Sequence, residues 1–148
     1  MNELSDLYQE MILDHNRSPL NYGTLSDPDH VSHGDNPLCG DKVALFLKMD
    51  GVVIEDIRFQ GVGCAISTAS ASLMTESVKG KPREEALRTM EKFHSMVTEE
   101  GGGDFEELGK LAAFSGVRDY PVRVKCATLV WHTFRAAIDG GANTVSTE

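Results

Sequence analysis

Residues 43–59 read VALFLKMDGVVIEDIRF, two apolar runs on either side of Asp50 and Gly51. Valine, isoleucine, leucine and phenylalanine dominate both runs, and these residues favour β-strands. An Asp-Gly pair tolerates the positive φ angles that a two-residue hairpin turn requires. The stretch therefore predicts an antiparallel hairpin with strands at 43–49 and 52–59.

The rest of the chain is mostly helical in pattern. Residues 61–65 allow a third short strand, although two glycines weaken it. The segment 24–37 is rich in Ser, Asp, His, Pro and Gly, which is typical of an irregular loop. Apolar residues recur at helical spacing elsewhere, and this predicts helices at 4–15, 67–79, 82–97, 105–114 and 119–139. We expect a single domain over 1–139 and a small, polar, disordered tail over 140–148.

Charge and composition exclude some classes of function. The 148 residues carry a formal net charge of -9, which argues against a general surface for nucleic acid or anionic lipid. No apolar run approaches the roughly 18 to 20 residues that cross a bilayer, so no membrane partner is expected. The three cysteines are an odd number and no basic-then-apolar leader opens the sequence, which favours a cytoplasmic protein with reduced thiols.

The three cysteines come from three separate predicted elements. Cys39 precedes the first strand, Cys64 lies between a strand and a helix, and Cys126 lies in the final helix. Asp41 follows Cys39 by two positions, and residues i and i+2 of an extended chain point to the same side. These four side chains are candidate ligands for one metal ion. Such a site would exist only in the folded domain, because no local Cys-x-x-Cys pair is present.

Each candidate ligand also has a simpler explanation. Cys126 lies on an apolar helical stripe and by itself favours core packing, whereas Cys64 by itself allows either role. Asp41 by itself fits a turn or a strand edge. Spacing alone leaves metal binding and these alternatives open. The histidines do not decide between them: His30 and His33 are expected in solvent, and surface or packing roles are expected for His15, His94 and His132.

Two cations flank the third cysteine. Arg123 and Lys125 would partly neutralise a centre of three thiolates and one carboxylate, which carries a formal charge of -2 around a divalent ion.

The segments around the three cysteines resemble those of a known family. The blocks at 36–41, 61–67 and 123–129 are similar to the three cysteine blocks of the IscU/SufU family of iron-sulfur cluster assembly proteins. Ile12-Leu13-Asp14-His15, with Pro19, Asn21 and Gly23, resembles the N-terminal signature of that family, and the stretch at 78–81 resembles a helix end. The resemblance covers roughly residues 4 to 138.

Two features place the resemblance in the SufU-like branch. The scaffold branch usually has histidine immediately before the third cysteine, where this sequence has Lys125. The segment between the second and third cysteines is also longer than in scaffolds, with an insertion at 91–110 for which the sequence suggests no role beyond a solvated helix and loop, or a docking surface.

The resemblance implies a fold, a metal centre and a function. The implied fold is α+β, with a small three-stranded antiparallel sheet packed against a layer of helices. Zinc would be bound by Cys39, Asp41, Cys64 and Cys126, and Cys39 would accept sulfur from a SufS-type, PLP-dependent cysteine desulfurase while Arg123 assists. A SufBCD-type assembly complex would act downstream. The alternatives are a scaffold that holds a transient [2Fe-2S] cluster and a purely structural zinc module.

Overall fold

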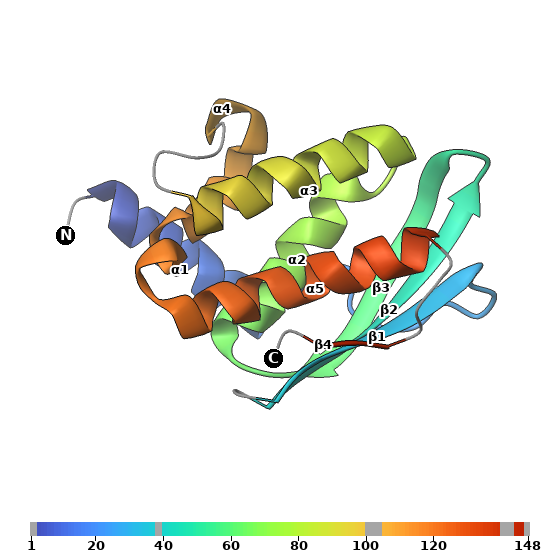
Figure 1. The fold of residues 1–148 in the computed structure, drawn as a ribbon, viewed down its shortest axis with the longest axis horizontal. Coiled ribbons are helices and arrows are strands. Elements are labelled where there is room, and N and C mark those ends of the chain that lie inside the picture. Colours follow the sequence, from blue (N-terminus) through green and yellow to red (C-terminus); the bar gives the residue numbers. More distant parts are fainter. Residues whose placement is uncertain (1–2, 38–39, 100–104, 140–143, 147–148) are drawn as a thin grey trace.

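The structure is a computed structural model that describes residues 3–37, 40–99, 105–139 and 144–146. The strand order of its sheet is β3 (Val53–Val62), β2 (Asp41–Asp50), β1 (His30–Asn36) and β4 (Thr144–Ser146). The helices gather on one side of the sheet, and α5 (Pro121–Asp139) runs across the strands (Figure 1). This arrangement confirms the predicted α+β class, with antiparallel pairing among the first three strands. Among the helices that the structure describes, none has the length and apolar composition needed to cross a bilayer.

The predicted hairpin is confirmed as β2 (Asp41–Asp50) and β3 (Val53–Val62). Its turn lies one residue later than predicted, because Asp50 pairs with Val53 and leaves Gly51 and Val52 as the two central residues. Gly51 adopts a φ of 62° at the first central position, which is the place where a type II′ turn requires glycine. The strand β3 continues through Gly61 and ends at Val62, so the separate third strand predicted at 61–65 is wrong.

The third strand of the sheet is β1 (His30–Asn36), which lies inside the segment predicted to be an irregular loop. Its inward positions are Ser32, Gly34 and Asn36, all buried. Buried and less buried positions therefore alternate along β1, as in any half-buried strand. The buried positions hold small or polar residues, whereas strands are predicted from large apolar residues at such positions. Gly34 must be small, because a Cβ there would lie 2.1 Å from Thr133 Oγ1 of α5.

A fourth strand, β4 (Thr144–Ser146), pairs in parallel with β1. It lies within the segment predicted to be a disordered tail, so this part of the tail is paired with the sheet. Residues 140–143 and 147–148 of that predicted tail lie outside the described residues.

Helices are found in all five predicted regions. They are α1 (Glu3–Arg17), α2 (Ala65–Val78), α3 (Arg83–Thr98), α4 (Phe105–Leu108) and α5 (Pro121–Asp139). The helix predicted at 105–114 is α-helical only in its first turn, and it continues as the 3-10 helix η1 (Gly109–Asp119).

Helix α2 is the central helix of the layer, in contact with α1, α5 and β3. Its buried face is wide and consists mostly of alanine and serine, which lets neighbouring helices approach closely. Ser70 Oγ, for example, donates a 2.6 Å hydrogen bond to the carbonyl oxygen of Ala127 on α5. Aromatic rings fill the space between α3, η1 and α5, where Phe93 stacks on Trp131 at 5.0 Å.

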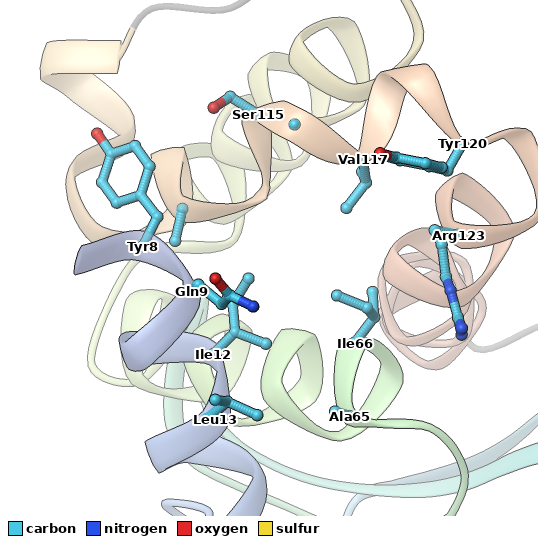
Figure 2. A pocket seen from close by; sticks show the side chains of 12 residues that line it. Tyr8, Gln9, Ile12, Leu13, Ala65, Ile66, Ser115, Val117, Tyr120 and Arg123 are labelled. Atoms are coloured by element: carbon cyan, nitrogen blue, oxygen red, sulfur yellow. The ribbon is translucent and has the colours of Figure 1, made fainter. Parts of the chain in front are cut away.

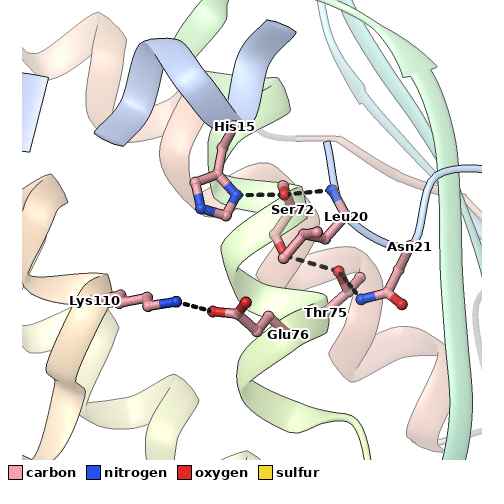
Figure 3. Close-up of polar contacts among 7 residues, drawn as sticks. All are labelled: His15, Leu20, Asn21, Ser72, Thr75, Glu76 and Lys110. Carbon is pink, nitrogen blue, oxygen red and sulfur yellow. Dashed lines mark hydrogen bonds and ion pairs between the residues drawn. The ribbon is translucent and has the colours of Figure 1, made fainter. Parts of the chain in front are cut away.

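A cluster of hydrogen bonds connects the end of α1 and the residues after it with α2 (Figure 3). The backbone N–H of Leu20 donates to Ser72 Oγ at 2.8 Å, and His15 Nδ1 lies 2.7 Å from the same hydroxyl. Asn21 Nδ2 donates to Thr75 Oγ1 at 3.1 Å. Burial is the main cause that lowers the pKa of His15. His15 is therefore a packing residue, one of the two roles that the sequence left open.

Candidate metal centre

The candidate centre begins with Asp41, the first residue of β2. Its side chain is fully buried, because the strand register places it opposite Asn36 of β1 and on the inward side. Asp41 Oδ1 accepts a 2.9 Å hydrogen bond from the backbone N–H of Cys64. A buried carboxylate of this kind does not fit the alternative of an exposed turn or edge residue.

Gly63 makes the approach of Asp41 possible. A Cβ at this position would lie 2.5 Å from Asp41 Oδ1, closer than any real contact of that kind. The chain between β3 and α2 can pass over the carboxylate only because it has no side chain at this point.

Two cysteines complete the described part of the centre. Cys64 is the N-cap residue of α2, in extended conformation, and is partly exposed. Cys126 lies near the start of α5 and is fully buried. One carboxylate oxygen of Asp41 and the two sulfur atoms all lie within 4.8 Å of one another. Three elements that are distant in sequence therefore converge on one point.

The donor set fits a zinc ion. Zinc in proteins is bound tetrahedrally by thiolate sulfur at about 2.3 Å and carboxylate oxygen at about 2.0 to 2.2 Å, so ligand atoms lie roughly 3.5 to 3.8 Å apart. The described atoms need only small movements to reach this geometry. Two thiolates and one carboxylate leave one tetrahedral position to be filled. Cys39, the fourth predicted ligand, lies outside the described residues.

Arg123 lies beside both described cysteines. Proximity to the Cys64 sulfur is the largest cause that raises the pKa of the Arg123 guanidinium, and hydrogen bonds to Cys126 and Cys64 act in the same direction. The side chain is nevertheless exposed, so it can reach the centre and the solvent together. His30 and His33 lie on β1 and belong to no metal-ligand group among the described residues.

Asn36 is a residue of the centre that the sequence did not single out. It is fully buried at the end of β1, and its Nδ2 lies 3.5 Å from Asp41 Oδ2 and 3.7 Å from Cys126 Sγ. Polar residues at alternate positions of 30–36 were the available signal. A strand is predicted from alternating apolar residues, so the polar composition of this segment predicts a loop instead.

A pocket of about 740 Å³ opens next to the centre. Figure 2 shows residues of α1 on one side of it, with Tyr120 and Arg123 on the other side and Ile66 of α2 between them. Most of its lining is apolar and comes from Tyr8, Ile12, Leu13, Ala65, Ile66, Ala113 and Val117. Arg123 therefore connects the pocket with the cysteines.

Residues 7–127 match the family described as the NifU-like N-terminal domain. This match covers most of the chain and includes all three described residues of the centre. The chain belongs to the NifU-like N-terminal domain family. This match confirms the family relationship that was predicted from the cysteine blocks.

Proteins of two kinds are similar to this chain over nearly its whole length. The zinc-dependent sulfurtransferase SufU of Bacillus subtilis is 42% identical over 135 residues, which cover 91% of this chain and 91% of that protein. The iron-sulfur cluster assembly scaffold protein IscU of Streptococcus pyogenes is 41% identical over 143 residues, which cover 97% of this chain and 89% of that protein.

Two solved structures share the fold of this chain. A putative iron-sulfur cluster assembly scaffold protein for the SUF system, from Fervidobacterium islandicum, superposes with a TM-score of 0.83 at 38% identity and covers 87% of this chain and 94% of its own. A NifU-like protein from Brucella abortus gives a TM-score of 0.83 at 28% identity, over 93% and 96% of the two chains.

Proposed function

We propose that this protein acts in iron-sulfur cluster biogenesis as a zinc-dependent sulfur carrier. The observation that carries the proposal is the convergence of Asp41, Cys64 and Cys126 within 4.8 Å, next to the segment that contains Cys39. Similarity to the Bacillus subtilis sulfurtransferase supports zinc as the ion and sulfur transfer as the reaction.

Cys39, Asp41, Cys64 and Cys126 would hold the ion. Zinc supplies a charge that keeps the cysteines as thiolates, and thiolates are the reactive form. Gly40 has a φ of 72°, so the backbone beside Cys39 turns in a conformation that glycine adopts without strain. Cys39 is the ligand best placed to leave its position, since the other two cysteines belong to helix termini packed in the fold.

Cys39 would accept sulfur by thiol exchange with a persulfide on the donor protein. Its thiolate attacks the terminal sulfur, a new sulfur-sulfur bond forms at Cys39, and the bond to the donor cysteine breaks. The donor cysteine leaves as a thiolate, so no external oxidant or reductant is needed. A SufS-type, PLP-dependent cysteine desulfurase is the donor we propose, and a SufBCD-type complex is the proposed recipient.

Arg123 would assist while Cys39 is away from the ion. Its exposed guanidinium already lies beside Cys64 and Cys126, where it can balance negative charge on the remaining ligands. The same cation can steady the carboxylate of Asp41 if that ligand is displaced.

The scaffold function is the second candidate. It is supported by the names of the Streptococcus pyogenes and Fervidobacterium islandicum proteins, which are 41% and 38% identical to this chain, against 42% for the sulfurtransferase. Three thiolates and one oxygen ligand can also hold a [2Fe-2S] cluster weakly enough to release it. Lys125, which stands where scaffolds usually carry histidine, favours sulfur transfer because it removes a potential ligand.

Metal content separates the two functions. Aerobically purified protein should be colourless and carry about one zinc per chain, as the single four-ligand site requires. A brown, iron-rich preparation obtained without oxygen would instead favour the scaffold.

Substitution of Cys39 tests the sulfur acceptor. Cys39→Ser should lose both the stimulation of the desulfurase and the persulfide detected by mass spectrometry on the peptide that contains residue 39. Asp41→Ala is the matched control, because it removes a proposed ligand and keeps the acceptor thiol. A Cys39→Ser protein that stimulates cysteine turnover as well as wild type would contradict the assignment.

A further inference from the structure

The amide of Asn36 lies among the ligands of the candidate centre without being one of them. Asn36 is the last residue of β1 and is fully buried, paired across the sheet with Asp41. It is separated from Cys126 by 90 positions in the sequence, so only the packing of α5 on β1 brings the two together.

The orientation of the amide follows from its neighbours. Nδ2 lies 3.5 Å from Asp41 Oδ2 and 3.7 Å from Cys126 Sγ, and its two hydrogens allow one donation to each. Exchanging nitrogen and oxygen would place the carbonyl oxygen against a carboxylate and a sulfur, which are both acceptors. The amide therefore presents its N–H groups to the ligands.

The carbonyl oxygen of the Asn36 amide lowers the stability of the folded state. Asn36 Oδ1 is buried, and no hydrogen-bond partner for it is found in the part of the chain that the structure describes. A buried acceptor without a partner destabilises the folded state, because it loses its hydrogen bonds to water. Core packing alone would be better served by an apolar residue of the same size, so the N–H groups are the feature that the position needs.

We propose that Asn36 is a positioning residue of the metal centre, whose amide orients Asp41 and Cys126 and weakens the electron donation of the Cys126 sulfur. The proposal rests on the metal centre put forward above, and it is independent of which reaction the centre supports. Asp41 then has a donor on each oxygen, since Oδ1 accepts from the backbone of Cys64 and Oδ2 from Asn36. The carboxylate is thereby held with respect to both described cysteines.

Hydrogen bonding to a metal-bound thiolate has a spectroscopic consequence. Donation of an N–H lowers the energy of the sulfur lone pairs, so charge transfer from sulfur to a metal requires more energy. Partners of this kind also orient ligands, and their loss typically weakens metal affinity by about 10- to 100-fold. Cobalt(II) reports both effects, because it occupies zinc sites and absorbs light where zinc does not.

The test compares the wild-type chain with Asn36→Leu, a substitution of similar size that removes the N–H groups. Both proteins are stripped of metal, checked for folding by circular dichroism, and titrated with cobalt(II) and then with zinc in competition with a chelator. The Leu variant should bind zinc about 10- to 100-fold more weakly. Its sulfur-to-cobalt band should move to longer wavelength.

Thr133→Val is the matched control. Thr133 is also fully buried, on the same helix as Cys126, but its hydroxyl donates to the carbonyl of Leu129 and bonds to neither Asp41, Cys64 nor Cys126, the three described residues of the centre. The Val variant should keep the wild-type spectrum and affinity. Asn36→Ala, which opens space where leucine fills it, provides the same comparison if the Leu variant does not fold.

The outcomes separate the two proposals. Wild-type protein that binds neither metal contradicts the metal centre, and with it the role of Asn36. Wild-type protein that binds cobalt, together with folded Asn36 variants of unchanged spectrum and affinity, overturns the role of Asn36 and leaves the centre standing. A change of equal size in Thr133→Val would assign the effect to packing and also overturn the proposal.

Discussion

Gly63 is the residue at which the geometry of the centre can be tested with the smallest possible change. A methyl group there would lie 2.5 Å from Asp41 Oδ1, so Gly63→Ala must displace either the carboxylate or the chain before α2. We expect zinc affinity to fall by at least about 10-fold, as with other changes that misplace a ligand. Competition with a chelator measures the loss.

Gly116→Ala serves as the control for that substitution. No atom of the described residues lies within 4 Å of a Cβ at this position, and its φ angle is not in the left-handed region. The control should keep the affinity of wild type. A Gly63→Ala protein that binds zinc as tightly as the control would show that Asp41 is not held in the arrangement described here.

At the scale of elements, the packing of β1 on α5 could not be predicted from the sequence. Gly34→Ala would place a methyl group 2.1 Å from Thr133 Oγ1 and 3.0 Å from side-chain carbons of Leu129 and Val43. Overpacking of this kind typically lowers the free energy of unfolding by about 1 to 3 kcal/mol. Urea denaturation followed by circular dichroism should show that loss.

A second substitution on α5 identifies the cause. Thr133→Ala removes the closest atom, so the double variant Gly34→Ala with Thr133→Ala should be less destabilised than the sum of the two single variants. Additive effects would mean that Gly34 and Thr133 do not meet, and that β1 does not pack on α5 as described.

The contact between α1 and α2 should weaken in acid. Burial lowers the pKa of His15; Glu76 and Asp14 oppose this effect, and Lys110 adds to it. The unfolded chain therefore binds a proton more readily than the folded chain does. The free energy of unfolding should fall as the pH decreases from about 7 to about 5, and His132, whose pKa is also lowered by burial, contributes in the same direction.

Unfolding measured across that pH range tests the contribution of His15. His15→Gln should reduce the slope of stability against pH. An identical slope in the wild-type and His15→Gln proteins would show that the ring is not buried against Ser72.

At the scale of the whole molecule, the core and the metal centre make separate contributions to stability. The core includes large side chains from β2, β3, α2, α3 and α5, and side chains of α1 pack against it, so chelation of zinc should leave the secondary structure in place. Zinc at about 100-fold above its dissociation constant should add about 2.7 kcal/mol to the free energy of unfolding. Loss of the helical circular dichroism signal on chelation would instead indicate a fold that depends on metal.

Local patterns were enough to predict much of this molecule. The hairpin, five helical regions and the cysteine blocks were all recognisable, because turn chemistry, apolar periodicity and short motifs depend on neighbours in sequence. The same reasoning placed Cys64 correctly at the start of a helix. It misplaced the hairpin turn by one residue, since pairing between the strands decides which two residues are central.

Contacts between distant segments decided the rest. Strand β1 can be recognised only from its contacts with α5. Gly34 is small because Thr133 of α5 lies beside it, and Asn36 is polar because it faces Cys126 of α5. The same holds for Gly63, whose lack of a side chain matters only because Asp41 lies beneath it. Sequence by itself therefore determined the hairpin, the helical regions and the candidate ligands. Tertiary structure determined β1 and which of the ligands meet, because a contact across 90 positions leaves no periodic signal in the chain.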